Sequence, residues 1–339
     1  MSKNILTKGR GRLIHFRKKL MVMATVVTCA LFTLFGTDFG QAYAEEKKHS
    51  DYWVAVTDQA SEQILVFDTK KTNLNAKSAL KWSWAPTEEN GFDEELISAW
   101  GTPSGVKLRK AEDGGKYMLV TDSEGLVAMV SYPNGKRVWG HNVGGNPHAA
   151  ELLPDGNVAA ASSHGHFVRV YTASQGPDSS NYTEYYLQGA HGVLWDPKRE
   201  VLWALGDLYL VSLKVTGTPE APKLEEISRS SLPTFGGHDL SPVYSDIDKL
   251  WVTTNTNVYQ YSKSTNTWSE NYEGASEISR KSVKSIGDQP SGQVVLAVPR
   301  AGTKYSWTTD TVDFYLPSDK RVLNGGSFYK ARIWNPNYQ

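Results

Sequence analysis

Three histidines recur along the chain at nearly equal intervals and could carry chemistry together. His148, His191 and His238 are separated by 43 and 47 residues, and each stands at the start of a short strand-like stretch. Three neutral imidazoles could hold a divalent metal ion with one position left open for water or substrate. Without a metal, a neutral imidazole beside a lysine could act as a general base on an anionic substrate. These three residues are therefore the candidate catalytic or metal-binding residues.

Other polar residues occupy equivalent positions in neighbouring repeats. The position of the three histidines is taken elsewhere by Ser104, Lys284 and Lys330. A second polar set ends a later strand of each repeat: Asp58, Asp122, Ser163 with His164, Asp207, Asn255 and Arg300. We predict that both sets meet at one surface, where the cationic side chains neutralise an anionic ligand. Trp100 is the tryptophan placed to stack on a sugar there, with Tyr305 and Trp307 as second choices.

These positions belong to a strand pattern that repeats every ~45 residues. Each repeat has a short apolar strand, such as residues 191–196, then a turn, a second apolar strand, a polar turn and a third alternating strand. Looser fourth strands follow, for example at residues 183–187 and 268–272. No long segment has the 3.6-residue period of an amphipathic helix. Four short strands in each repeat are typical of a β-propeller.

The two ends of the chain predict how the ring closes. Residues 52–58 follow the second-strand pattern, so the first repeat lacks its inner strand, whereas residues 330–336 match the inner-strand pattern of residues 191–197. We predict an all-β, six-bladed β-propeller with four-stranded blades, in which the C-terminal strand completes the N-terminal blade. The first strand of each blade then lines a central channel, and both polar sets lie at one mouth of it. Residues 87–99 and 301–309 are expected to be loop insertions.

A structural interpretation competes with the functional one for each of these residues. A histidine that follows a glycine at the start of an inner strand also occurs in WD-repeat propellers, where it bonds within its own blade. Asp58, Asp122 and Asp207 could be turn residues whose carboxylates accept hydrogen bonds from their own backbone. His164 and His166 are better explained as exposed turn residues than as ligands.

The first 44 residues have the pattern of a secretory signal peptide. A basic stretch from Arg10 to Lys19 precedes an apolar run over residues 20–35, and Ala42-Tyr43-Ala44 offers small residues at a cleavage site. We predict cleavage after Ala44, a short polar leader over 45–51 and a single propeller domain over 52–339. The apolar run is shorter than the roughly 20 residues that a membrane span needs. We therefore expect a secreted, extracellular protein without a stable membrane span.

Composition narrows the class of partner. Cleavage after Ala44 removes seven basic residues and one acidic residue, so the remaining 295 residues carry 29 basic and 35 acidic side chains, a net charge of −6. An acidic chain without a basic face is not expected to bind nucleic acid. The single cysteine, Cys29, leaves with the signal, so stability must come from the core rather than from disulfides. We expect a monomer.

Two segments resemble those of known families. Residues 189–197 (Gly-Ala-His-Gly-Val-Leu-Trp-Asp-Pro) and 329–334 (Tyr-Lys-Ala-Arg-Ile-Trp) are similar to segments of secreted bacterial six-bladed propellers of uncharacterised function. That resemblance spans residues 45–339 and implies the fold without implying an activity. A fainter similarity is to oligogalacturonate lyases, propellers of pectin degradation with a histidine-rich, metal-binding centre. Their metal motif has no residue-by-residue match in this chain, so no residue role is carried over.

Three functions remain open. The first is binding of a glycan or a small anionic ligand at the histidine- and lysine-ringed channel mouth. The second is an enzyme at the same place, either a histidine-based polyuronate lyase or a hydrolase assisted by a divalent metal. The third is a scaffold for protein–protein interaction. The ring of histidines favours the first two, and the lack of a Gly-x-Ser-x-Gly or His-Glu-x-x-His motif favours binding over catalysis.

Overall fold

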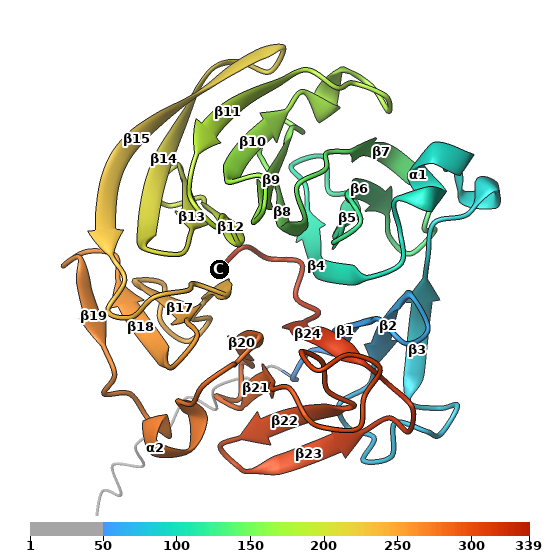
Figure 1. Ribbon diagram of the computed structural model, residues 1–339, viewed down its shortest axis with the longest axis vertical. Coiled ribbons are helices and arrows are strands. Elements are labelled where there is room, and N and C mark those ends of the chain that lie inside the picture. Colours follow the sequence, from blue (N-terminus) through green and yellow to red (C-terminus); the bar gives the residue numbers. More distant parts are fainter. Residues whose placement is uncertain (1–49) are drawn as a thin grey trace, which may run out of the picture. The chain divides into compact units, whose positions relative to one another are not determined.

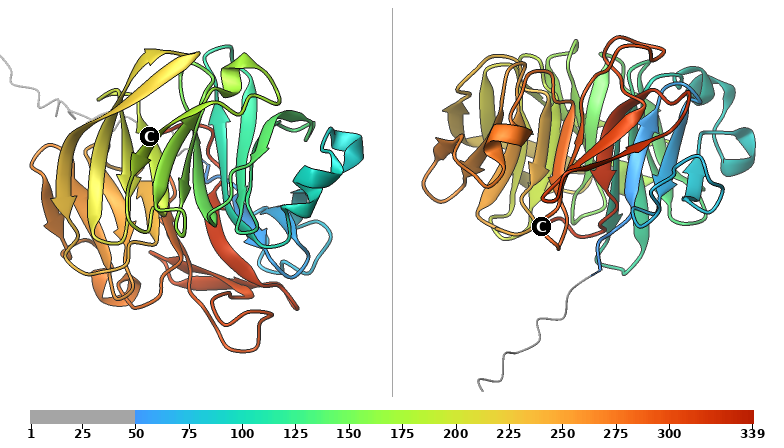
Figure 2. Two further views of the ribbon diagram at one scale, coloured as in Figure 1. Left: turned by 45° about the horizontal axis from the view of Figure 1, so that its top comes forward. Right: turned by 90° about the horizontal axis from the view of Figure 1, so that it is seen from below.

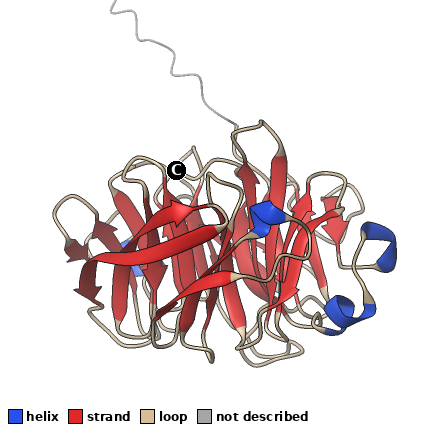
Figure 3. Cartoon of the chain, turned by 90° about the horizontal axis from the view of Figure 1, so that it is seen from above, coloured by secondary structure: helices blue, strands red, loops and turns tan. Residues whose placement is uncertain are grey.

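The computed structural model describes residues 50–339, which form six four-stranded antiparallel sheets arranged in a ring about a common centre (Figure 1). The predicted signal peptide and leader residues 45–49 lie outside the described residues. Within residues 50–339, no helix is both long and apolar enough to cross a membrane. Seen from the side, the chain is almost entirely strand and connecting loop, with only short helices (Figure 3). The predicted all-β, six-bladed propeller is confirmed.

The blades are numbered in chain order, and the strands of each blade follow one another from the centre of the ring outward. Blade 1 is β24 (Phe328–Ile333), β1 (Val54–Asp58), β2 (Gln63–Phe67) and β3 (Leu80–Trp84). Blade 2 is β4 (Pro103–Lys110), β5 (Lys116–Asp122), β6 (Leu126–Ser131) and β7 (Arg137–Asn142). Blade 3 is β8 (Pro147–Leu152), β9 (Val158–Ser162), β10 (Phe167–Tyr171) and β11 (Tyr182–Tyr186).

The second half of the ring repeats this order. Blade 4 is β12 (Gly192–Asp196), β13 (Val201–Leu205), β14 (Tyr209–Thr218) and β15 (Ala221–Ser231). Blade 5 is β16 (Asp239–Pro242), β17 (Lys249–Thr253), β18 (Val258–Ser262) and β19 (Thr267–Ser269). Blade 6 is β20 (Ser285–Asp288), β21 (Val294–Ala297), β22 (Thr311–Tyr315) and β23 (Asp319–Val322). The long hairpin of β14 and β15 forms the outer part of blade 4 (Figures 1 and 2).

The C-terminal strand closes the ring, as predicted. β24 pairs antiparallel with β1, joining Ile333 to Val54 and Phe328 to Asp58 across almost the whole chain length. This pairing covers the edge that β1 would otherwise expose, so the ring is held by main-chain hydrogen bonds without a disulfide.

Apolar residues fill the gaps between neighbouring blades. Six buried hydrophobic clusters occur in the described part, and each draws its members from two adjacent blades. Second strands such as β9 and β13 are buried on both faces, which explains why they read as continuous apolar runs rather than alternating ones. The inner strands also approach closely: a Cβ at Gly105 would lie 2.7 Å from the carbonyl oxygen of His148. Only glycine fits there.

Short helical turns occupy three of the loops that connect strands in the described part of the chain. Residues 87–99, expected as a loop insertion, contain the 3-10 turn η1 (Glu88–Asn90) and the helix α1 (Glu94–Ser98), and the Asp93 side chain caps α1. The turns η2 (Ala173–Gln175) and α2 (Ala275–Ile278) lie in connections within blade 3 and between blades 5 and 6. Residues 301–309 form a loop at the channel mouth, between β21 and β22.

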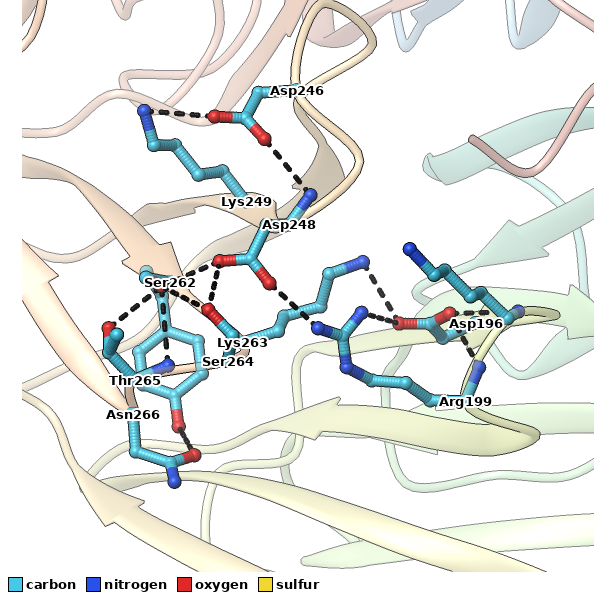
Figure 4. A network of polar contacts seen from close by, with 12 residues as sticks. Asp196, Arg199, Asp246, Asp248, Lys249, Ser262, Lys263, Ser264, Thr265 and Asn266 are labelled. Carbon is cyan, nitrogen blue, oxygen red and sulfur yellow. Dashed lines mark hydrogen bonds and ion pairs between the residues drawn. The ribbon is translucent and has the colours of Figure 1, made fainter.

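The chain end lies across the channel opening opposite that mouth. After β24 the chain turns inward, and Figure 1 marks the C-terminus near the centre of the ring. Tyr338 donates a hydrogen bond to the carbonyl oxygen of Leu152, and Gln339 accepts one from Lys263 at 2.7 Å. Lys263 also pairs with Asp196 at 2.9 Å, within a polar network between blades 4 and 5 (Figure 4).

Candidate functional site

Bulges at the start of three inner strands decide which side chains face the channel mouth. In β4 the pairing passes from Pro103 to Gly105 and skips Ser104, and in β8 it skips His148 in the same way. In β24, Tyr329 and Lys330 together stand opposite Thr57. A bulge adds one residue to a strand. Phe328 pairs with Asp58 in blade 1 as Pro147 pairs with Ser162 in blade 3. The next residue along is Tyr329 in β24 and His148 in β8, so Tyr329 rather than Lys330 corresponds to His148.

A cavity of about 760 Å³ lies at this mouth and is termed the mouth cavity. Its lining includes all three predicted histidines, His148, His191 and His238, together with Lys284. Tyr329 is part of the same lining, with its ring centroid 5.4 Å from that of His148. The structure therefore brings together four of the six residues in the predicted inner set.

The three imidazoles do not point at a common centre. The rings of His148 and His191 are stacked, with centroids 4.1 Å apart and planes 9° apart. The His238 ring stands edge-on to His191, with centroids 5.1 Å apart and planes 85° apart. Within residues 50–339, no group of three or more His, Cys, Asp or Glu side chains is arranged to hold a metal ion. The divalent-metal site predicted for these histidines is not found in the described part of the chain.

His238 and Lys284 form a close polar pair. Nε2 of His238 lies 2.8 Å from Oδ1 of Asn255, within hydrogen-bond distance. The ammonium Nζ of Lys284 lies 3.3 Å from the same Nε2 and 6.0 Å from the centroid of the Tyr329 ring. Asn255, predicted as a ligand-binding residue, thus orients the histidine.

Burial and neighbouring cations hold the histidines neutral. The pKa of His148 is lowered well below 6.5 by burial and by the nearby Lys330 ammonium, and the pKa of His191 is lowered by burial and by His148. Burial and Lys284 lower the pKa of His238 to about 4. Burial lowers the pKa of Lys284 itself to about 8. At neutral pH the floor of the mouth cavity therefore holds three neutral imidazoles and one mostly protonated lysine.

Lys284 has no carboxylate partner among the described residues. The ion pairs of residues 50–339 do not include it, and burial alone accounts for the shift of its pKa. By contrast, Lys330 is completely buried below the mouth and pairs with Asp239 at 3.3 Å. Lys284 is therefore the cation of the predicted set that is available to an anion in the mouth cavity.

Several predicted site residues serve the structure instead. Ser104 is fully buried and donates a hydrogen bond of 2.6 Å to the carbonyl oxygen of Pro147, which ties blade 2 to blade 3. Asp58 accepts hydrogen bonds from Ser61 in its own turn and from the backbone N–H of Ser327. The contacts of Asp58 within its own turn correspond to its structural interpretation.

Three further candidates do not line the mouth cavity. Asp122 accepts hydrogen bonds from the backbone of Gly101, Thr102 and Glu124, although burial raises its pKa to about 6. The guanidinium of Arg300 binds both carboxylate oxygens of Asp313, at 2.7 and 3.0 Å. The Trp100 indole donates to the carbonyl oxygen of Glu62 and packs edge-on against Trp84, within the core between blades 1 and 2.

Asp207 does line the mouth cavity, as predicted. Its carboxylate packs against Gly189, which has φ +63°, and a Cβ at that glycine would lie 2.1 Å from Cγ of Asp207. The glycine that precedes the apolar strand at 192–196 is therefore required for a steric reason. Burial raises the pKa of Asp207 above its ordinary value.

The rest of the lining of the mouth cavity combines residues that the sequence did not single out with residues that it did, among them Ser163 of the second polar set. Gln59, Glu124 and Tyr329 line it, as do His164 and His166, which the sequence favoured as exposed turn residues. The two second-choice aromatics, Tyr305 and Trp307, also line it, and their rings are stacked with centroids 4.8 Å apart and planes 7° apart. The length of the insertion at residues 301–309 was the available signal for this aromatic pair.

Six closed four-stranded blades with a polar cavity at one channel mouth define a six-bladed β-propeller with a candidate ligand site on its axis. The chain belongs to a family of unknown function (DUF6528), which matches residues 19–334. No curated protein is similar enough to match it.

Two solved bacterial structures of unknown function share the fold. A protein from Bacteroides caccae is 12% identical, with a TM-score of 0.50, and the match covers 83% of this chain and 94% of that one. A protein from Desulfotomaculum acetoxidans is 9% identical, also with a TM-score of 0.50, covering 85% of this chain and 90% of that one. At these identities the likeness concerns the fold alone.

Proposed function

We propose that the chain binds an acidic sugar, a uronate or a short uronate oligomer, in the mouth cavity. The observation that carries the proposal is Lys284, a cation on the cavity floor with no carboxylate partner among the described residues. Leaving a partly buried charge without a partner costs free energy, and an anionic ligand would recover that cost. The predicted export signal supports a ligand outside the cell.

The rest of the cavity suits a sugar ring rather than a simple inorganic anion. The stacked pair of Tyr305 and Trp307 provides an aromatic face at the rim, and Trp307 is 45% exposed. Aromatic faces pack on the apolar faces of sugar rings while polar neighbours bind the hydroxyl groups. Glu124 and Asp207 line the cavity and offer acceptors for ring hydroxyls. One ligand carboxylate on Lys284 and several hydroxyls on these acceptors describe a uronate.

Binding is favoured over a histidine-based lyase for a chemical reason. A lyase must remove the proton next to the uronate carboxylate, and an efficient base has a pKa near the working pH. The pKa of His238 is lowered to about 4, and those of His148 and His191 are also lowered well below 6.5. Such imidazoles accept hydrogen bonds and pack against a ring, but they are weak bases.

Calorimetric titration with galacturonate and trigalacturonate, with galactose as the neutral counterpart, tests the proposal. The expected result is binding of the uronates and no measurable binding of galactose. Lys284→Met should weaken uronate binding by at least about tenfold, the scale of one lost charge-assisted hydrogen bond. Lys249→Met is the matched control, because Lys249 is an exposed lysine paired with Asp246 away from the mouth.

Two results would overturn the proposal. One is equal binding of galactose and galacturonate by the wild-type protein, or no binding of either uronate probe. The other is uronate binding that Lys284→Met and Lys249→Met leave equally strong. If an unsaturated uronate product accumulates during the titration, seen by its ultraviolet absorbance, the site is a lyase and the binding-only function is wrong.

A further inference from the structure

A second cluster of charges lies deeper in the channel, below the mouth cavity. Lys107 and Arg109 on β4 both pair with Glu151 on β8, while Lys330 and Arg332 on β24 both pair with Asp239, the first residue of β16. All six residues are buried. Four cations thus face two carboxylates, which leaves a positive excess in a place where unbalanced charge is costly.

Arg332 has one donor that nothing in the described chain satisfies. Its two terminal nitrogens bind the two carboxylate oxygens of Asp239 side by side. Its Nε–H has no hydrogen-bond partner among the described residues. The donor is buried, since the whole residue is only 8% exposed. Buried donors of this kind are almost always paired, with protein or with a bound molecule.

Arg332 also lines a small cavity. It has a volume of about 30 Å³, and its lining combines three of the four cations, Lys107, Arg109 and Arg332, and the polar Ser241 and Tyr244 with the mainly apolar Val106, Leu194, Leu240, Pro242, Ile286, Gly287 and Ile333. A buried water needs roughly 10–15 Å³, so the space holds one or two waters or one ion not much larger than water. It is too small for a sugar, a phosphate or a carboxylic acid of any size.

Two neighbouring polar groups already have hydrogen-bond partners of their own. Asp288 accepts hydrogen bonds from the Trp251 indole and from the backbone N–H groups of Tyr244 and Ser245. The hydroxyl of Tyr244 donates to the carbonyl oxygen of Asn337 in the C-terminal segment. Neither group supplies an acceptor to the Nε–H of Arg332.

We propose that this cavity binds a single chloride ion, with the Nε–H of Arg332 as a donor and Lys107 and Arg109 as the other cations beside it. The ion would balance part of the positive excess and satisfy the unpaired donor. It would also oppose the burial that lowers the pKa of Lys107 to about 8 and of Lys330 to about 7. The site is separate from the mouth cavity and does not depend on the function proposed there.

Crystals of the full mature chain grown in sodium bromide test the proposal, because bromide replaces chloride and gives an anomalous signal. The expected result is an anomalous peak inside the channel, within hydrogen-bond distance of Nε of Arg332. Electron density there without an anomalous signal would mean water, and would overturn the proposal. Peaks confined to the protein surface would mean an adventitious ion only and would overturn it equally.

Stability in solution gives an independent readout. The melting temperature of the wild-type protein should rise with sodium chloride and level off at saturation, relative to sodium gluconate at equal ionic strength, because chloride binds the folded state. Arg332→Lys keeps a positive charge for Asp239 but removes the Nε–H, and should abolish this difference. Arg300→Lys is the control, because Arg300 pairs with Asp313 outside the channel. Equal melting in both salts for the wild type would contradict the proposal even if Arg332→Lys did not fold.

Discussion

The imidazole rings of His148 and His191 are stacked face to face, with centroids 4.1 Å apart. Two protonated imidazoles at this separation would repel each other, and Lys330 lies just below, with Nζ 3.3 Å from the carbonyl oxygen of His148. The stack is therefore incompatible with two protonated rings. This arrangement links the pair to the pH dependence of stability.

The folded protein should lose stability as the pH falls from about 6.5 to about 4. Unfolded histidines have a pKa near 6.5, whereas the pKa of His238 in the fold is about 4 and those of His148 and His191 are also lowered. The unfolded state thus binds more protons in this window, and each histidine contributes up to about 1.4 kcal/mol per pH unit to the slope. Chemical unfolding at several pH values measures it.

The matched variant for this prediction is His238→Gln, which cannot titrate in that window. Its unfolding free energy should depend less steeply on pH between 6.5 and 4 than that of the wild type. The buried carboxylates Glu151 and Asp239 have lowered pKa values, so their own contribution is lost mainly below that window. Parallel curves for the two proteins would show that the fold does not lower the pKa of His238.

Uronate binding should weaken as the pH rises through about 8. Burial lowers the pKa of Lys284 to about 8, so the free protein loses the cation that the ligand carboxylate needs at a lower pH than an exposed lysine would. Lys284→Arg stays charged at every pH used and should move the loss to higher pH. Titration calorimetry at pH 6, 8 and 9.5 makes the comparison, and identical profiles for wild type and Lys284→Arg would contradict it.

Trp307→Ala should reduce uronate binding with little change in stability. The indole is 45% exposed, lines the mouth cavity and donates to Oε1 of Gln59 at 3.1 Å. Loss of a stacking face should cost about 1–2 kcal/mol of binding free energy. Trp53→Ala is the control. Trp53 is 37% exposed, precedes β1 and does not line the mouth cavity. A similar loss of affinity in both variants would argue against stacking at Trp307.

Lys263→Met should destabilise the fold. Lys263 and Asp196 form an ion pair with exposed side-chain fractions of 0% and 2%, and Lys263 also donates to Gln339 (Figure 4). Removing one partner of a buried pair and leaving the other charge uncompensated costs about 3–5 kcal/mol. Asp196 keeps a second ion pair with Arg199 at 3.5 Å, so Lys263→Met should cost less than that range but more than about 1 kcal/mol. Lys249→Met breaks an ion pair in which both side chains are 41% exposed, and should cost less than about 1 kcal/mol. Denaturant unfolding measures both variants.

The fold was largely predictable because it depends on local and repeated information. Short apolar strands separated by turns recur every ~45 residues, and the unmatched strands at the two ends pair with each other. The positions of His148, His191 and His238 at one channel mouth follow from the same repeat, since equivalent positions in equivalent blades lie on one ring.

The candidate site was predictable only in part, because a side chain's partners come from neighbouring blades. Nothing near Asp122 or Arg300 in the sequence indicates whether the charged group binds a ligand or a neighbour within the fold. In the structure, Asp122 accepts hydrogen bonds from backbone N–H groups, and Arg300 forms an ion pair with Asp313. Lys284 and Lys330 look alike in sequence, yet Lys284 faces the mouth cavity and Lys330 is buried beside Asp239.

The number of blades, the closing strand and the end of the ring at which polar residues gather all follow from the repeat in the sequence. Which of those residues share a cavity depends on how the blades pair and pack. One extra residue in a strand reverses every side chain after it, so the bulge in β24 places Tyr329 at the mouth and Lys330 in the channel. Tyr329 and Lys330 lie opposite Thr57, and Lys330 is 273 residues away from it in the sequence. Because such a bulge is defined by pairing with so distant a strand, no local pattern in the chain specifies it.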